Sequence, residues 1–170
     1  MEKLIKQLHE FRYEADHLIN SAQYLLPSRE VSLAHTNLQR CKMWLGKVLQ
    51  ELKVQTPYPD SENPANKTIE PQADHTDNSL MSVWKEMEPS QTVRVKHFRA
   101  RCEELARPMN ELLAEPAPPG VNLTGKASII LITATLALEE AKMWLGWELD
   151  RIRKIKEHGE PVREMIRLEL

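Results

Sequence analysis

The side chains best suited to chemistry in this chain are cations and hydroxyls that stand at two predicted helix starts. The first group is Ser28, Arg29, Ser32 and Thr36, and the second is Thr124, Lys126, Ser128 and Thr133. A helix N-terminus presents free backbone amides and a partial positive charge, so each group predicts a seat for a phosphate. Helix capping and solvation is the alternative explanation for either group taken alone.

Basic and aromatic side chains on other predicted helices extend this prediction. Arg12, Tyr13 and His17 lie on the helix before the first group, and Arg99 and Arg101 lie on a later helix. These residues could supply charge and base stacking beside a phosphate seat. The pattern therefore favours binding of a phosphorylated ligand over bond breaking.

Catalytic patterns in the sequence are incomplete. Glu14 and His17 have the Glu-x-x-His spacing of di-iron helical bundles, but those proteins need the motif on two helices. Glu139 and Glu140, with Glu103, suggest a magnesium-dependent nucleotide pyrophosphohydrolase, yet no further carboxylate follows one turn on. The sequence has no phosphate-binding glycine loop, no Gly-x-Ser-x-Gly and no Cys-x-x-Cys. We predict no metal, no cofactor and no catalysis, with the hydrolase as the alternative.

A tandem duplication supplies the elements that position these groups. Residues 42–46 read Lys-Met-Trp-Leu-Gly and recur unchanged at 142–146, an offset of 100. A second match, at an offset of 87, relates Phe11, Arg12, Asp16, Leu18, Leu25 and Leu26 to Phe98, Arg99, Glu103, Leu105, Leu112 and Leu113. Each copy is therefore two helices long. The offsets differ because the second copy has a longer loop, rich in proline and glycine.

Apolar residues spaced at three and four predict an all-α fold of tandem helical hairpins with four main helices. The second helix should begin with Ser28 or Ser32 as its cap. The other three expected helices span about 2–26, 92–113 and 126–158.

Prolines and small polar residues predict an extended acidic linker between the hairpins. Within the linker, residues 79–90 could form a short helical or tethered segment that Met81, Trp84 and Met87 anchor. The chain thus divides into a first hairpin over 1–56, the linker over 57–91 and a second hairpin with a longer loop over 92–170.

Composition excludes several classes of protein. With 23 basic and 25 acidic residues the net charge is −2, which argues against binding of nucleic acid polymers. Cys41 and Cys102 have apolar neighbours inside predicted helices and should be buried thiols. No apolar stretch approaches the roughly 20 residues of a membrane span, and the first residues carry charges where a signal peptide needs an apolar core. We expect a cytoplasmic protein that binds no membrane.

Two further patterns predict packing. The run 129–132 reads Ile-Ile-Leu-Ile and is apolar on all sides, which predicts burial either between the hairpins or against another chain. Trp44 and Trp144 should face the core. Gly46 and Gly146 suggest a close helix crossing, because glycine inside a helix costs roughly 1 kcal/mol against alanine.

Several short runs resemble one family of helical proteins. They are Ser28-Arg29-Glu30-Val31-Ser32-Leu33-Ala34, Met43-Trp44-Leu45-Gly46-Lys47, Pro57-Tyr58-Pro59 and Thr68-Ile69-Glu70-Pro71-Gln72-Ala73-Asp74-His75. In these runs the chain resembles the hairpin domain shared by phage anti-CBASS and anti-Thoeris proteins. The resemblance covers residues 5–77 and, through the internal repeat, 96–155. Members often carry one hairpin per chain, whereas this chain has two, and its second loop lacks Ser-Arg-Glu.

The resemblance implies a non-catalytic sponge in the cytoplasm of an infected bacterium. Such a protein holds cyclic nucleotide immune signals, either cyclic oligonucleotides or cyclic ADP-ribose isomers, and keeps the effector silent without cleaving them. Pockets in the family form where hairpins of different chains meet, which implies a homo-oligomer, here a dimer or trimer. Tyr13 would carry over as a base-stacking group and Arg29 as a phosphate-holding group, with Lys126 added by analogy. A protein-binding scaffold is the remaining alternative.

The ligand-binding residues expected from these arguments come from both copies. They are Tyr13, Arg29, Ser28, Ser32, Thr36, Arg12, Arg99 and Lys126.

Overall fold

The protein is all-α, as its apolar spacing predicts. The computed structural model describes residues 1–54, 90–114, 123 and 125–158, and these form four α-helices and a short 3-10 helix, with no strand. The α-helices are α1 (Glu2–Ser21), α2 (Arg29–Glu51), α4 (Gln91–Leu113) and α5 (Lys126–His158), and η1 (Ala22–Tyr24) is the 3-10 helix. The expected linker, apart from its last two residues, and most of the proline-rich loop of the second hairpin lie outside the described residues.

α4 and α5 have the predicted bounds to within a residue, and the first helix ends early. α1 stops at Ser21 instead of Leu26, and the chain tightens into η1 before an extended Leu25. Pro27 keeps Leu26 out of helical conformation. Backbone groups before the proline bond elsewhere, since the Tyr24 carbonyl accepts from Arg94 and the Leu26 amide donates to Gln91, both of α4. α2 then begins with Ser28 as its cap, whose Oγ accepts a hydrogen bond from the Val31 amide at 3.1 Å.

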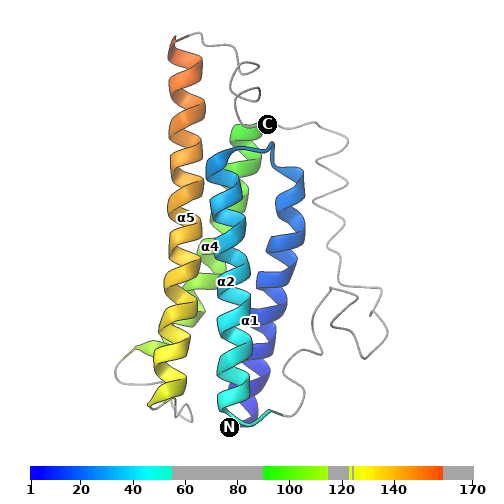
Figure 1. Cartoon of the computed structure of the whole chain (residues 1–170), viewed down its shortest axis with the longest axis vertical. Helices are drawn as coiled ribbons and strands as arrows, with labels where there is room; N and C mark the ends of the chain where they lie inside the picture. Colours follow the sequence, from blue (N-terminus) through cyan, green and yellow to red (C-terminus); the bar gives the residue numbers. More distant parts are fainter. Residues whose placement is uncertain (55–89, 115–122, 124, 159–170) are drawn as a thin grey trace.

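The two hairpins lie side by side and point in opposite directions (Figure 1). The α1–α2 loop is toward one end of the molecule, where Ser28 contacts Glu148 in the second half of α5. At the other end, Glu51 at the end of α2 pairs with Lys126 at the start of α5. α2 and α5 are therefore antiparallel neighbours, and theirs is the most extensive helix contact in the described structure.

Ion pairs repeat between the two hairpins at equivalent positions. Asp16 pairs with Lys42 in the first hairpin, and their counterparts Glu103 and Lys142 pair in the second. In each hairpin the lysine of the repeated Lys-Met-Trp-Leu-Gly segment thus ties the second helix to the first. The same sequence relationship that predicts the duplication also places the same contact twice.

Two other ion pairs join a residue to its own counterpart. Glu14 lies 2.9 Å from Arg101, at the offset of 87, and Arg40 lies 3.1 Å from Glu140, at the offset of 100. A residue meets its own counterpart only where a twofold axis passes. The hairpins are therefore related by a pseudo-twofold axis that runs through the α1–α4 side and the α2–α5 side of the bundle.

The core is built from equivalent residues of both copies. Leu38 and Leu45 of α2, like Leu138 and Leu145 of α5, are fully buried. Trp44 and Trp144 are partly buried and pack against this core, in accord with their predicted role. Both cysteines are buried and free, as predicted. Burial raises the pKa of the Cys102 thiol to about 12 and raises that of Cys41 as well, so neither thiol is a ready nucleophile.

The apolar run at the start of α5 is only half buried. Ile130 and Leu131 lie in the core, whereas Ile129 and Ile132 are exposed by 64% and 43%. Packing between the hairpins therefore accounts for two of the four residues. The other two face outward from the bundle.

The glycine in the second repeated segment does not mark a close helix crossing, and that prediction is wrong at Gly146. A Cβ built at Gly146 meets only the Arg99 Nε among the described residues, at an ordinary 3.7 Å. Alanine fits there without moving a neighbour.

Gly146→Ala should therefore stabilise the protein by about 0.5–1 kcal/mol, because alanine loses less backbone entropy in a helix interior. Urea unfolding followed by circular dichroism measures the change. Gly125→Ala is the matched control: Gly125 also has open space around it but sits at φ +60°, where a side chain is strained, so this variant should be less stable than the parent. A loss of stability in Gly146→Ala would mean that the Arg99 contact matters more than helix propensity.

Candidate ligand-binding site

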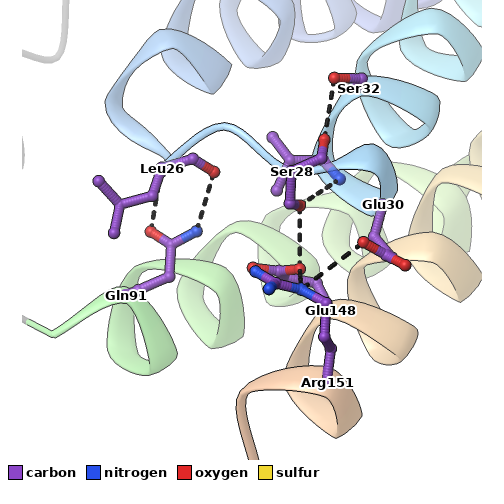
Figure 2. A network of polar contacts seen from close by, with 8 residues as sticks. Leu26, Ser28, Glu30, Ser32, Gln91, Glu148 and Arg151 are labelled. Carbon is purple, nitrogen blue, oxygen red and sulfur yellow. Dashed lines mark hydrogen bonds and ion pairs between the residues drawn. The ribbon is translucent and has the colours of Figure 1, made fainter. Parts of the chain in front are cut away.

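A buried carboxylate organises the end of the bundle where the first predicted phosphate seat lies (Figure 2). The Glu148 side chain is 0% exposed. It accepts a hydrogen bond from Ser28 Oγ at 2.9 Å, and Nε and Nη2 of Arg151 each donate to it at 2.8 Å. Arg151 Nε also lies 3.6 Å from a carboxylate oxygen of Glu30.

This network explains how a charge is kept inside the bundle. A buried carboxylate is tolerated when it is paired and hydrogen-bonded, and Glu148 has both a cation and a hydroxyl. Its hydrogen bond raises the pKa of the Arg151 guanidinium. The consequence is a fixed connection from the loop of the first hairpin to α5 of the second.

The start of α4 holds the same loop from another side. The Leu26 amide donates to Gln91 Oε1 at 2.9 Å, and Gln91 Nε2 donates to the Leu26 carbonyl at 3.3 Å. Arg94 Nη1 donates to the Tyr24 carbonyl at 3.0 Å. The loop between α1 and α2 is thus fixed by both helices of the second hairpin.

The predicted residues around this loop divide into two kinds. Ser28 is structural, because its single hydroxyl hydrogen goes to Glu148 while its oxygen caps α2. Ser32 and Thr36 hydroxyls donate to backbone carbonyls one turn earlier and lie at the surface. Arg29 is exposed. With spacings of three and four, Arg29, Ser32 and Thr36 share one face of α2.

A hollow of about 550 Å³ opens beside this face, between the end of α1, η1 and the start of α2. Its lining is apolar with polar groups among it: Ile19, Asn20, Ala22, Gln23, Leu25, Pro27, Val31, Ser32 and His35. Small-molecule sites typically have volumes of about 300–1,000 Å³ with this kind of lining. Ser32 is the predicted residue that lines it, and Arg29 lies one turn away on the same helix face.

The remaining predicted residues lie elsewhere. Arg12 is buried, at 2% exposure, and Tyr13 is half-buried in the middle of α1. Arg99 is an exposed residue of α4 beside Gly146. Lys126 is at the opposite end of the bundle, with its Nζ 2.9 Å from Glu51. The two predicted phosphate seats therefore cannot act on one ligand within a single chain.

The carboxylates of the hydrolase alternative are engaged with cations of the same chain. Glu103 and Glu139 both contact Lys142, and Glu140 contacts Arg40. Burial alone would lower the pKa of Lys142, but the hydrogen bonds that its ammonium donates to Glu103 and Glu139 raise it, so the ammonium stays charged. Within the described ranges, no group of three or more histidines, cysteines, aspartates or glutamates is arranged to hold a metal ion.

The sequence argument missed both Glu148 and the polar lining of the hollow. The duplication holds one usable signal: Glu148 stands at the position that Val48 occupies in the first copy, and Val48 is on the apolar face of its helix. A carboxylate at an apolar position indicates a buried pair. Asn20, Gln23 and His35 carry no such signal, because their meeting depends on where α1 ends.

Comparison of the chain with protein-family models, with curated proteins and with solved structures finds no match. Among the helices described, none has the length and apolar character that a membrane span requires.

Removal of the buried carboxylate should cost much more stability than removal of a neighbouring surface hydroxyl. Glu148→Ala should lower the free energy of unfolding by about 3 kcal/mol, because Arg151 and Ser28 lose their shared partner. Ser28→Ala should lose about 1 kcal/mol with the cap. Ser32→Ala, one turn on, is the control and should change stability by less than about 0.5 kcal/mol. Equal urea midpoints for Glu148→Ala and Ser32→Ala would refute the role assigned to Glu148.

Proposed function

We propose that this protein is a non-catalytic sponge that binds cyclic nucleotide immune signals and keeps them from their effector during phage infection. The observation that carries the proposal is the hollow beside the first hairpin loop, with Ser32 in its lining and exposed Arg29 one turn away. The nucleotide class comes from the resemblance to anti-CBASS and anti-Thoeris proteins. The ligand would be a cyclic oligonucleotide or a cyclic ADP-ribose isomer in the cytoplasm of the host.

The lining of the hollow suits the two parts of a nucleotide. Ile19, Leu25 and Val31 offer an apolar surface for a base. The α2 N-terminus places a partial positive charge nearby, and Arg29 can add two charge-assisted hydrogen bonds to a phosphate. The ligand would thus lie with its base against the hairpin and its phosphate toward the helix start.

The loop that borders the hollow is held before any ligand arrives. Gln91, Arg94 and Glu148 contact its residues from two neighbouring helices. A site that is already ordered loses little conformational entropy on binding. Such a site suits a protein that must compete with an effector for a scarce signal.

Binding without turnover is the form of the proposal that the side chains favour. The thiols are buried, and Glu103, Glu139 and Glu140 are each paired with a cation of the chain. A hydrolase would need those carboxylates to hold magnesium instead. As in the family it resembles, the protein would act as a homo-oligomer, a dimer or trimer of this chain.

One experiment separates a sponge from a hydrolase and from a scaffold. The full chain is incubated with a panel of cyclic di- and trinucleotides and cyclic ADP-ribose isomers, then heat-denatured, and the released small molecules are analysed. Intact ligand recovered in stoichiometric amount supports the sponge. Progressive loss of ligand that a chelator abolishes supports the hydrolase. No retained ligand and no thermal shift with any member of the panel supports the scaffold.

Arg29→Ala should weaken binding of the ligand so identified at least about tenfold, because a charge-assisted hydrogen bond contributes roughly 1.5–3 kcal/mol. The Tm of the ligand-free protein should not change, since Arg29 is exposed. Isothermal titration calorimetry and a thermal melt measure the two quantities.

Lys126→Ala is the control for charge, because Lys126 lies at the opposite end of the bundle and pairs with Glu51. It should weaken binding only if the second loop also forms a pocket. If Arg29→Ala binds as tightly as the parent and melts several degrees lower, Arg29 stabilises the helix start and the phosphate is held elsewhere.

A further inference from the structure

A row of large apolar side chains lies on the outer face of α5. The five residues, with their exposed fractions, are Ile129 64%, Ile132 43%, Leu136 57%, Met143 42% and Trp147 52%. Their spacings of three, four, seven and four residues place them on one helical face. At roughly 1.5 Å per residue the row is about 27 Å long. We call this row the α5 stripe.

The duplication provides an internal comparison for the α5 stripe. The equivalent positions of α2, at the offset of 100, hold Arg29, Ser32, Thr36, Met43 and Lys47. Both helices occupy the same place in a pseudo-symmetric bundle, and both faces point outward. In the first copy this outward face of α2 carries mostly polar side chains. The fold therefore does not require apolar side chains at the equivalent positions of α5. An exposed apolar row of this length, interrupted between Leu136 and Met143 by Glu140, marks an interaction site.

The order of residues along the α5 stripe is close to self-complementary. In an antiparallel pair of α5 helices centred near position 138, Ile129 meets Trp147 of the second copy and Ile132 meets Met143 of the second copy. A twofold interface requires that each residue meet a partner that meets it in return. An unrelated partner would not impose this pattern.

Charges at the ends of the α5 stripe favour the same arrangement. Lys126 and Asp150 flank the stripe, and within one chain they pair with Glu51 and with Arg153 and Lys154. The antiparallel register sets Lys126 opposite Asp150 of the second copy, twice, so each charge gains a further opposite charge. A parallel register would set lysine against lysine and aspartate against aspartate. Glu139 and Glu140 are the carboxylates near the middle, and each pairs with a cation of its own chain, Glu139 with Lys142 at 2.7 Å and Glu140 with Arg40 at 3.1 Å. The carboxylates that the pairing brings near the axis are thus partly offset by Lys142 and Arg40.

We infer that the α5 stripe is the interface at which two copies of this chain pair, helix against antiparallel helix, about a twofold axis. This inference specifies the homo-oligomer of the proposed function, but it rests on α5 and not on the hollow beside the first loop. The structure then has two levels of twofold symmetry: the pseudo-twofold between hairpins within a chain and the twofold between chains. A sponge so built would display two hollows per dimer.

The test measures the mass of the full chain in solution by sedimentation velocity over a range of concentrations. The parent should reach twice the 19.7 kDa of one chain. A variant that carries the first copy's own residues on the stripe, Ile132→Ser with Leu136→Thr and Trp147→Lys, should have a dimer dissociation constant at least about tenfold higher. These residues already occur in the same fold at exposed positions, and circular dichroism checks that the variant is helical.

Met43→Ser is the matched control, because Met43 is the counterpart of Met143 and is equally exposed, at 45%. It should leave the dimer unchanged, while Met143→Ser alone weakens it. Lys126→Glu should also weaken the dimer, and addition of Asp150→Lys should restore it if the helices are antiparallel. A parent that stays monomeric, that forms an odd-numbered assembly, or that dimerises equally well with the stripe replaced overturns the inference. The amount of nucleotide that the same variants bind and release tests the proposed sponge function independently of the dimer. Either proposal can therefore be refuted while the other stands.

Discussion

The carboxylate of Glu148 is the constraint on which the loop end of this molecule depends. A charge with no exposure to water needs partners, and Glu148 finds them in Arg151 of its own helix and in Ser28 of the other hairpin. Ser28 in turn fixes where α2 begins. The position of α2 relative to the end of α1 sets the shape of the hollow that we propose as the ligand site. An interaction between the hairpins therefore determines a feature that lies within the first hairpin.

Duplication followed by divergence explains how one chain holds both hairpins. On a twofold axis a residue meets its own counterpart, so two identical hairpins would bring two glutamates or two arginines together. Here the counterparts have opposite charges: Glu14 with Arg101, and Arg40 with Glu140. The Arg40–Glu140 pair is about half exposed, so it contributes little to stability. Its effect is on specificity, since it favours pairing of a first hairpin with a second over pairing of like with like.

The two copies also diverge on their outward faces, and both the proposed ligand site and the proposed dimer interface lie on those faces. The outer face of α2 keeps Arg29 and Ser32 near the hollow, whereas the same face of α5 has become the apolar stripe. A fused pair of equivalent hairpins would offer two identical faces and two identical pockets. Under the two proposals this chain divides the tasks: the first hairpin would present a ligand site, and the second would present a surface for another chain. Lys126 pairs with Glu51 at the far end, away from the proposed ligand site of the same chain.

The sequence by itself determined the helices and their relationship. The bounds of α4 and α5, the burial of both cysteines, and the duplication all follow from apolar spacing and repeated residues, which are local properties of the chain. Tertiary structure decided what those helices bring together. The opposite direction of the hairpins separates Lys126 from Arg29 by the length of the bundle, and no local pattern encodes that direction. From the sequence, Ser28 could be a phosphate ligand or a helix cap. In the structure its hydroxyl donates to Glu148, a residue 120 positions away. That contact depends on the packing of the two hairpins, which helix periodicity does not fix.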